Sequence, residues 1–177
     1  MPKRIAVLVT HDFEELQYSE PVQAFRAARH SILNIEKSAG NIIYGQQRKA
    51  AVTIDHSIDD VGIDDVGIDD FDALLIPGGN SAQYLSEDAR FVHFVRHFAQ
   101  AEKPIMSICH GPQLLIAAKV VQGRLMTTIH TLSKQLVDAG GVYYDVGVVN
   151  DNNLYISSRS YADLAVFIHE SLQVLKQ

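Results

Sequence analysis

The single cysteine of the chain, Cys109, follows a short apolar run and precedes His110, Gly111 and Pro112. A buried strand, a nucleophile, a glycine two residues on and a proline suited to the first turn of a helix are together typical of a nucleophile elbow. A thiol at a helix N-terminus lies near the positive end of the helix dipole and near unpaired N–H groups, which lower its pKa below about 8.5. We therefore expect Cys109 to be a thiolate nucleophile rather than a small buried hydrophobe.

Two other apolar runs also end on residues that could take part in chemistry. The run at 5–9 leads into His-Asp-Phe-Glu-Glu, which contains Glu14, and the run at 73–76 leads into Gly78 and Gly79. Ligands of open α/β sheets bind outside the carboxyl ends of the strands, so we expect both segments to meet Cys109. Glu14 is either a surface carboxylate or, beside the thiol, a hydrogen-bond donor to sulfur or a proton shuttle. The glycine pair is either a tight turn or a place where backbone N–H groups approach an oxyanion.

The elements that must position these residues alternate between short β-branched runs and helical patterns. Strand-like runs lie at 5–9, 32–35, 73–76 and 105–108, and helical patterns lie at 21–29, 89–99, 112–119 and 164–175. Such alternation predicts βαβ units. The predicted fold class is therefore α/β, a flavodoxin-like three-layer sandwich in which a mainly parallel sheet has helices on both faces.

Two further segments predict β-hairpins and none predicts a domain boundary. The hairpins pair 42–44 with 51–54 around Gly45, and 142–149 with 154–157 around the Asn-Asp-Asn-Asn stretch at 150–153. The chain has 177 residues, 47% of them hydrophobic, which suits one core, and no Gly/Ser/Pro linker divides it. We expect a single domain over residues 1–177.

The formal net charge of −6 comes from one short region. The six aspartates that account for it are Asp59, Asp60, Asp64, Asp65, Asp69 and Asp70. Most lie in the pentamer Val-Gly-Ile-Asp-Asp, which occurs at 61–65 and again at 66–70; its spacing lacks the alternating ligands and terminal Glu of a calcium loop, so we expect a solvated loop. Because no basic stripe with interleaved aromatic residues occurs, we expect no nucleic-acid binding.

The N-terminal segment and the cysteine count predict a cytoplasmic protein. The apolar run at 5–9 is too short for a signal peptide or a membrane span, so no membrane partner is expected. A lone cysteine cannot close an intramolecular disulfide, which fits a reducing compartment.

One pair of histidines has the spacing of zinc ligands on a helix. His93 and His97 are four residues apart, but Phe91, Phe94 and Phe98 define the apolar face of that helix and leave the two histidines largely on the other side. Without a Glu between them or a third ligand, a zinc site is not expected. We predict neither a metal nor another cofactor.

Several motifs of the chain resemble, in order and spacing, those of the PfpI family of the ThiJ/PfpI, class I glutamine-amidotransferase-like superfamily. They are Asp12-Phe13-Glu14, Leu75-Ile76-Pro77-Gly78-Gly79, Ser107-Ile108-Cys109-His110-Gly111-Pro112-Gln113, Gly123-Arg124, Asp138-Ala139-Gly140 and Ser157-Ser158-Arg159. The resemblance implies that Cys109 is the nucleophile, Glu14 the carboxylate in contact with it and His110 the general base. It also implies oxyanion donors in the backbone amides of Gly79 and His110, and assembly as a homodimer or a higher homo-oligomer.

The sequence departs from the family pattern where protease-like members carry a Glu or Asp that reaches the histidine from a neighbouring subunit. Gln83 stands there, and an amide can hydrogen-bond an imidazole but cannot stabilise imidazolium by charge. Ser86 replaces a common Arg, and Arg159-Ser160-Tyr161 replaces an Arg-x-Pro pattern. His130, where related chains carry Tyr or Lys, either adds a second imidazole near Cys109 or is an ordinary surface or core histidine.

Three functions follow from these residues and this resemblance. The first is a cofactor-independent enzyme in which Cys109 adds to a small reactive carbonyl, as in glyoxalases and glycation-repair (deglycase) enzymes, and Glu14 or His110 moves the proton. The second is an intracellular cysteine peptidase or amidase that uses Cys109 and His110. The presence of Gln83 in place of an acid weakens this second hypothesis. The third is a redox-sensing or chaperone-like stress protein in which Cys109 is oxidised to sulfinic acid.

Overall fold

The computed structural model describes residues 1–61 and 67–177. Within these ranges a seven-stranded sheet has the order β10-β11-β7-β6-β1-β2-β5, parallel except for the β10–β11 pair. The strands are β1 (Arg4–Leu8), β2 (Ser31–Glu36), β5 (His56–Ser57), β6 (Ala73–Ile76), β7 (Ile105–Ile108), β10 (Val148–Asp151) and β11 (Tyr155–Ser158). The predicted α/β class with a mainly parallel sheet is confirmed.

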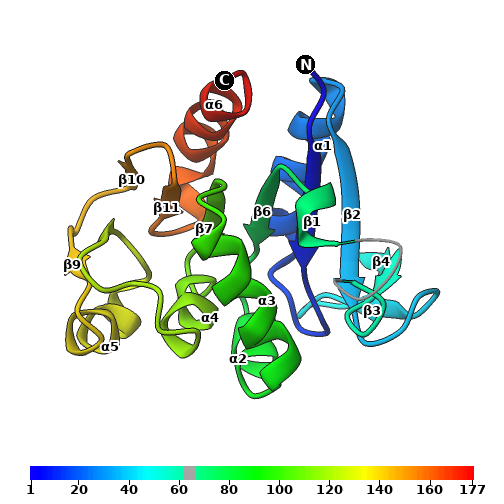
Figure 1. The fold of residues 1–177 in the computed structure, drawn as a ribbon, viewed down its shortest axis with the longest axis horizontal. Helices are drawn as coiled ribbons and strands as arrows, with labels where there is room; N and C mark the ends of the chain where they lie inside the picture. Colours follow the sequence, from blue (N-terminus) through cyan, green and yellow to red (C-terminus); the bar gives the residue numbers. More distant parts are fainter. Residues whose placement is uncertain (62–66) are drawn as a thin grey trace.

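Helices cover both faces of this sheet (Figure 1). They are α1 (Glu15–Ala27), α2 (Ser81–Ser86), α3 (Ala89–Gln100), α4 (Pro112–Ala117), α5 (Ser133–Asp138) and α6 (Leu164–Leu175). Helices α1 and α6 pack on one face, whereas α2 to α5 pack on the other. The two chain termini lie next to each other at one end of the sheet (Figure 1), where Lys3 Nζ donates a hydrogen bond to the backbone oxygen of Gln177 (3.2 Å).

Alternating side chains of the strands supply a separate apolar cluster on each face. In β1, Ile5 and Val7 join the cluster with Phe25 of α1, while Leu8 joins the opposite cluster with Phe94 of α3. Because successive residues of a strand point to opposite faces, a run that is apolar at every position is buried on both sides. Such strands place the residues at their carboxyl ends on a rigid support.

Two short β pairs flank the sheet at opposite edges (Figure 1). The predicted first hairpin is confirmed as β3 (Ile42–Tyr44) with β4 (Ala51–Thr53). The second prediction was right only for its C-terminal half, since β10 pairs with β11 but β9 (Val142–Tyr143) pairs in parallel with β8 (Leu125–Met126). The register of β9 is set by this distant partner, which a local turn pattern does not reveal.

Helix α1 begins at Glu15 rather than at Pro21, where the sequence pattern placed its start. The side chain of Glu14 accepts a hydrogen bond from the Gln17 N–H (2.8 Å) and caps the helix there. Pro21 lies inside the helix and is buried. A capped first turn and a buried face therefore outweigh the loss of one backbone donor at the proline.

The pentamer repeat falls partly outside the described residues. Of its two copies, residues 62–66 are not described, and a 3₁₀ turn, η1 (Ile68–Asp70), follows at the end of the second copy. Within residues 1–61 and 67–177, no helix has the length and apolar character needed to cross a membrane.

The carboxylate of Glu15 attaches the β3–β4 turn to α1. Glu15 is only 8% exposed and accepts hydrogen bonds from the backbone N–H groups of Gln47 (2.8 Å), Lys49 (2.6 Å) and Ala50 (2.8 Å). Burial acts to raise the pKa of this carboxyl, but the three backbone hydrogen bonds outweigh it and lower the pKa below its usual range. The first turn of α1, which carries Glu14 and Gln17, is thereby held in place.

We expect the replacement Glu15→Gln to destabilise the protein by about 2–3 kcal/mol at pH 7, because charge-assisted hydrogen bonds are lost and an amide N–H faces backbone donors. The folded-state pKa is lowered, so this contribution is fully present above the unfolded value of about 4.3 and is lost as the pH falls through the folded value. Urea unfolding of the two proteins over a series from pH 7 to about pH 3 should show a difference in free energy of unfolding that shrinks toward the acid end, as the pH falls through the lowered pKa. A difference that stays constant over the whole series would contradict this assignment.

Candidate active site around Cys109

Cys109 lies on a strained turn directly after β7. Its φ angle is +59°, in the left-handed region that non-glycine residues rarely adopt. Its N–H donates to the Ser158 oxygen (2.9 Å) and its carbonyl accepts from Thr128 Oγ1 (2.7 Å), so both sides of the turn are fixed. The expected elbow is confirmed, and the strain holds the thiol at the carboxyl end of an interior strand.

Two polar side chains lie beside the sulfur within the described residues. His110 Nδ1 lies 3.5 Å from Sγ, and the side-chain amide of Gln17 lies beside Cys109, where it acts to lower the pKa of the thiol. Gln17 is 3% exposed and belongs to the buried face of α1. The thiol is thus flanked by an imidazole and an amide.

The pKa of the Cys109 thiol is raised, not lowered as the helix-terminus argument predicted. Burial raises this pKa, hydrogen bonds from Gln17 and from the His110 backbone N–H oppose the rise, and the charge of Glu14 adds to it. The residue is only 7% exposed, and α4 is a helix of six residues. Desolvation of the thiolate therefore outweighs the local donors, and the thiol needs a base to lose its proton near pH 7.

His110 can act as that base. Burial lowers the pKa of its imidazole below its usual range, so the ring is neutral at pH 7. To accept the thiol proton at Nδ1, the ring must carry its own proton on Nε2. A neutral histidine beside a neutral thiol can take the proton at the moment sulfur attacks.

Among the described residues, no hydrogen bond joins the Glu14 carboxylate to the sulfur of Cys109. This carboxylate caps α1, and the Glu14 N–H donates to the Gly78 oxygen (3.1 Å). The charge of Glu14 raises the pKa of Cys109, whereas Gln17, one turn further along α1, acts to lower it. The contact between Glu14 and the thiol therefore stays a prediction, and an amide of the same helix has the stabilising effect on the thiolate.

Gly78 and Gly79 lie directly against the elbow and the start of α1. Gly79 pairs with Phe13 in an antiparallel bridge, in which Asn80 N–H donates to the Asp12 oxygen (3.0 Å) and Glu14 N–H donates to the Gly78 oxygen (3.1 Å). Between these two bonds, the Gly79 N–H has no acceptor within the described ranges. It is a donor without an acceptor one residue after Gly78, where a Cβ would lie 3.1 Å from Cβ of Cys109, and an oxyanion site requires such a donor.

We expect Gly79→Ala to destabilise the protein by about 2–4 kcal/mol, since the residue has φ +82° and a Cβ would collide with the backbone of Asp12 and Glu14. Gly123→Ala is the matched control, because Gly123 also has a positive φ (+75°) but nothing lies within 4 Å of a Cβ there. Chemical unfolding should show a clearly larger loss for Gly79. Equal losses would mean that the collision is relieved at no cost.

Two other predicted residues, Gln83 and His130, have exposed side chains. Gln83 is exposed on α2, and His130 is exposed at the start of η2 (His130–Leu132). Among the described residues neither makes a hydrogen bond to Cys109. The backbone nevertheless holds the segment before His130 close, since Ile129 N–H donates to the Cys109 oxygen (3.1 Å).

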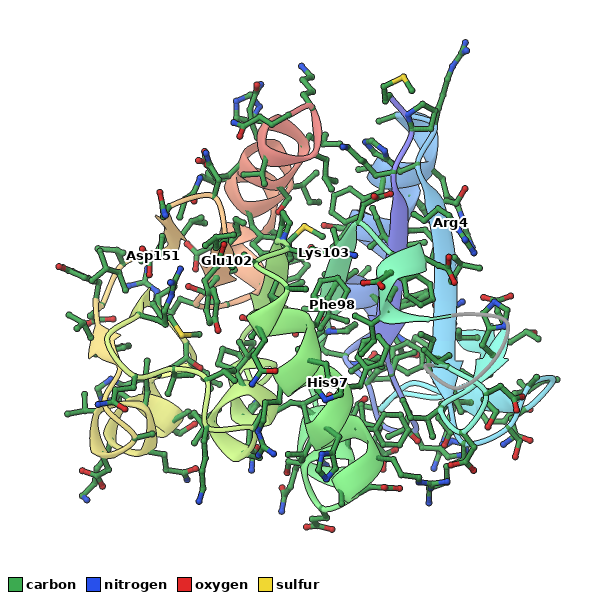
Figure 2. The ribbon with its side chains drawn as sticks, viewed as in Figure 1. Arg4, His97, Phe98, Glu102, Lys103 and Asp151 are labelled. Carbon is green, nitrogen blue, oxygen red and sulfur yellow. The ribbon has the colours of Figure 1, made fainter. Side chains whose placement is uncertain are left out.

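The histidine pair lies on the exposed side of α3, as predicted. His93 and His97, the latter labelled in Figure 2, line a hollow of about 510 Å³ whose lining includes no residue of the elbow. In the described part of the chain, no three His, Cys, Asp or Glu side chains gather as metal ligands would.

Sequence reasoning missed Gln17 and Thr128. Gln17 lies on the buried face of α1 with Tyr18, Pro21 and Val22. A polar side chain on a buried helical face needs a partner, and this is the signal that could have found it. Thr128 carries no such local signal, because its partner is the backbone oxygen of Cys109.

A parallel α/β sheet with its lone cysteine on a left-handed turn, next to a neutral histidine, defines a thiol protein of the nucleophile-elbow class. A family model described as the DJ-1/PfpI family matches residues 3–174. The chain belongs to that family, which confirms the resemblance of its motifs.

Relatives match over the whole length. "Protein/nucleic acid deglycase 2" of Escherichia coli is 45% identical over 99% of each chain. YraA of Bacillus subtilis, named as a candidate cysteine protease, is 42% identical over 99% of this chain and 100% of its own. Among solved structures, a two-domain protein of Anabaena variabilis with DJ-1/ThiJ/PfpI-like and ferritin-like domains is similar with a TM-score of 0.91 and 26% identity, covering 98% of this chain and 48% of that one.

Proposed function

We propose that this chain is a cofactor-independent thiol enzyme that acts on small reactive carbonyls such as methylglyoxal. The observation that carries the proposal is the elbow thiol of Cys109 with a neutral imidazole nitrogen 3.5 Å from its sulfur. An aldehyde carbon is an electrophile that such a thiol can attack without a metal. The free N–H of Gly79 supports the same reaction, because it can hydrogen-bond the oxygen on which charge develops.

The proposed addition moves one proton and one electron pair. Sulfur forms a bond to the aldehyde carbon while its proton passes to Nδ1 of His110 and the carbonyl π pair moves onto oxygen. The imidazolium then returns the proton to that oxygen, which gives a hemithioacetal. A base then removes the C–H proton, its electron pair forms a C=C bond, and the π pair of the neighbouring ketone moves onto the ketone oxygen, which takes up a proton to give an enediol. Addition of a proton at the former ketone carbon, with loss of the hydroxyl proton on the sulfur-bearing carbon, gives a thioester. Water adds to the thioester carbon, and the C–S bond breaks with return of a proton to sulfur, which releases the hydroxy acid and the free thiol. The carbon oxidised and the carbon reduced belong to the same substrate, so no external oxidant is needed.

The name of the E. coli relative supports this class of substrate. A deglycase removes glycation adducts, and such adducts form from reactive carbonyls, so the name points to the same class of compounds. That name also includes nucleic acids, whereas the formal charge of −6 here favours small or protein-borne adducts over binding of a polynucleotide surface. We propose small-molecule and protein-borne carbonyl adducts as substrates.

The deciding experiment measures conversion of methylglyoxal to lactate after the protein has been treated with a chelator and freed of metal. We expect turnover to survive this treatment. Loss of turnover that returns on addition of a divalent metal would contradict a cofactor-independent reaction. Absence of turnover in both states, by protein with a native unfolding transition, would exclude methylglyoxal chemistry altogether.

Peptide or amide hydrolysis by Cys109 and His110 is the second candidate, and the name of YraA favours it. Against it stands Gln83, exposed on α2, which places no charge beside an imidazolium. A fluorogenic peptide panel separates the two functions, and Gln83→Glu should raise peptidase activity if a missing acid limits it.

The redox-sensing alternative is disfavoured by the site itself. Sensor thiols are exposed and have lowered pKa values, but Cys109 is 7% exposed and burial raises its pKa. Intact mass after mild peroxide would still reveal selective addition of two oxygens. A cytoplasmic location and assembly as a homo-oligomer stay proposals, supported by the free thiol and by the family motifs.

A further inference from the structure

The buried amide of Gln17 has no role in the chemistry described so far. The residue is 3% exposed, and its Oε1 is buried without a hydrogen-bond partner in the described part of the chain. Buried polar atoms without partners are rare in proteins, and each calls for an explanation such as a role in the reaction. The surroundings of Gln17 supply one.

The amide is wedged between the glycine pair and the thiol. A Cβ on Gly78 would overlap Oε1 of Gln17, and the same position is 3.1 Å from Cβ of Cys109. On the other side, the backbone N–H of Gln17 is bonded to Glu14 Oε2 at 2.8 Å. The absent side chain at Gly78 therefore makes the space in which this amide reaches sulfur.

The chemistry of an amide differs from that of the carboxylate expected there. An amide donates through its N–H and accepts through its oxygen, but it neither gains nor loses a proton near pH 7. Within the described residues, His110 is then the one titratable side chain hydrogen-bonded to the sulfur. An N–H donated to sulfur by this amide would favour the thiolate over the thiol.

We propose that Gln17 is a catalytic residue that donates a permanent N–H hydrogen bond to the Cys109 sulfur, stabilises the thiolate formed during attack, and leaves all proton transfer to His110. The opposing effects on the thiol agree with this role, because the hydrogen bond from Gln17 lowers a pKa that burial raises. Loss of the amide should raise that pKa further. The inference deepens the proposed function but concerns the thiol alone, so it can be tested without a carbonyl substrate.

The test is the pH dependence of alkylation of the full-length protein by iodoacetamide, followed by intact mass. Cys109 is the only cysteine, so every adduct reports this site. The replacement Gln17→Met keeps the side-chain volume but removes the hydrogen-bond donor. We expect it to raise the pH midpoint of the alkylation rate by about one pH unit and to lower the rate at pH 8 about tenfold relative to the wild type. The control Gln100→Met, on the exposed side of α3, should keep the wild-type midpoint.

A second variant keeps the inference testable if Gln17→Met fails to fold. In Gln17→Glu an ionised carboxylate beside sulfur opposes the thiolate, so the midpoint should again move upward. A wild-type midpoint in a folded Gln17 variant, or an equal shift in Gln100→Met, would overturn the proposal. Methylglyoxal turnover is measured in parallel. A shifted alkylation midpoint without turnover in any of the proteins would refute the proposed function and support the role of Gln17. Turnover together with an unshifted midpoint would support the proposed function and refute the role of Gln17.

Discussion

Replacement of Cys109 by alanine should lower kcat/KM for methylglyoxal by at least about a thousandfold, because the proposed reaction passes through a covalent bond to its sulfur and no other thiol exists in the chain. Cys109→Ser should be nearly as inactive, since a hydroxyl is a far weaker acid than a thiol and a neutral imidazole cannot take its proton as readily. Lactate formation by metal-free protein measures the effect.

The control for this prediction is stability. Alanine and serine both have a Cβ, so they carry the same backbone strain as cysteine at φ +59°. The unfolding temperatures of both variants should therefore lie within a few degrees of the wild-type value, as expected for a small change at one site. Turnover by folded Cys109→Ala equal to that of the wild type would remove Cys109 from the reaction and with it the proposed function.

Replacement of His110 by alanine should lower kcat/KM at pH 7 by about a hundredfold or more and change the form of the pH profile. In the wild type the reactive state is the neutral thiol beside the neutral imidazole. Because burial lowers the pKa of His110 and raises that of Cys109, this state is populated throughout the neutral range. The wild-type rate should therefore fall only in acid, as the imidazole becomes protonated below its usual value of about 6.5, and stay level from there through neutral pH.

Without His110, free thiolate becomes the required species. Below the raised pKa of Cys109 its population grows about tenfold per pH unit, so the residual rate of His110→Ala should rise with that slope through pH 7 and 8. His97→Ala is the matched control, since His97 is exposed on α3 (Figure 2). A level profile in His110→Ala would show that another group accepts the proton.

These two predictions depend on the directions of two pKa shifts: the pKa of Cys109 is raised and that of His110 is lowered. Both shifts favour a neutral thiol beside a neutral imidazole over a thiolate–imidazolium pair. A thiolate–imidazolium pair would be expected if the donors around sulfur outweighed its desolvation. Here burial is the dominant influence on both groups, so the proton stays on sulfur until substrate arrives. Burial also limits the access of oxidants to Cys109, which is 7% exposed. Redox-sensor cysteines are accessible to solvent, so this burial agrees better with the proposed enzyme than with a sensor.

Much of the fold followed from local pattern. Apolar runs such as Ile105–Ile108 predict buried parallel strands because both of their faces are apolar, and α6 occupies the range that its periodicity indicated. The elbow was equally readable, since Cys109 and the glycine and proline after it determine the turn within a few residues. Each of these features depends on neighbours in the chain, and neighbours are what a sequence displays.

The identity of the group that contacts sulfur was decided by tertiary structure. Glu14 and Gln17 lie within one turn of each other, and the sequence pattern favoured the carboxylate as the group beside sulfur. In the structure, Glu14 caps the N-terminus of α1. Gln17 lies on the buried face of the helix, beside the thiol. The pKa of Cys109 was decided in the same way. It depends on how many atoms from distant segments exclude water from the sulfur, a sum that no local motif contains. The sequence alone singled out Cys109 as the candidate nucleophile, because its neighbours in the chain form the turn. Only the folded chain placed a buried amide and a neutral imidazole beside its sulfur, because packing brings them there from α1 and from the elbow.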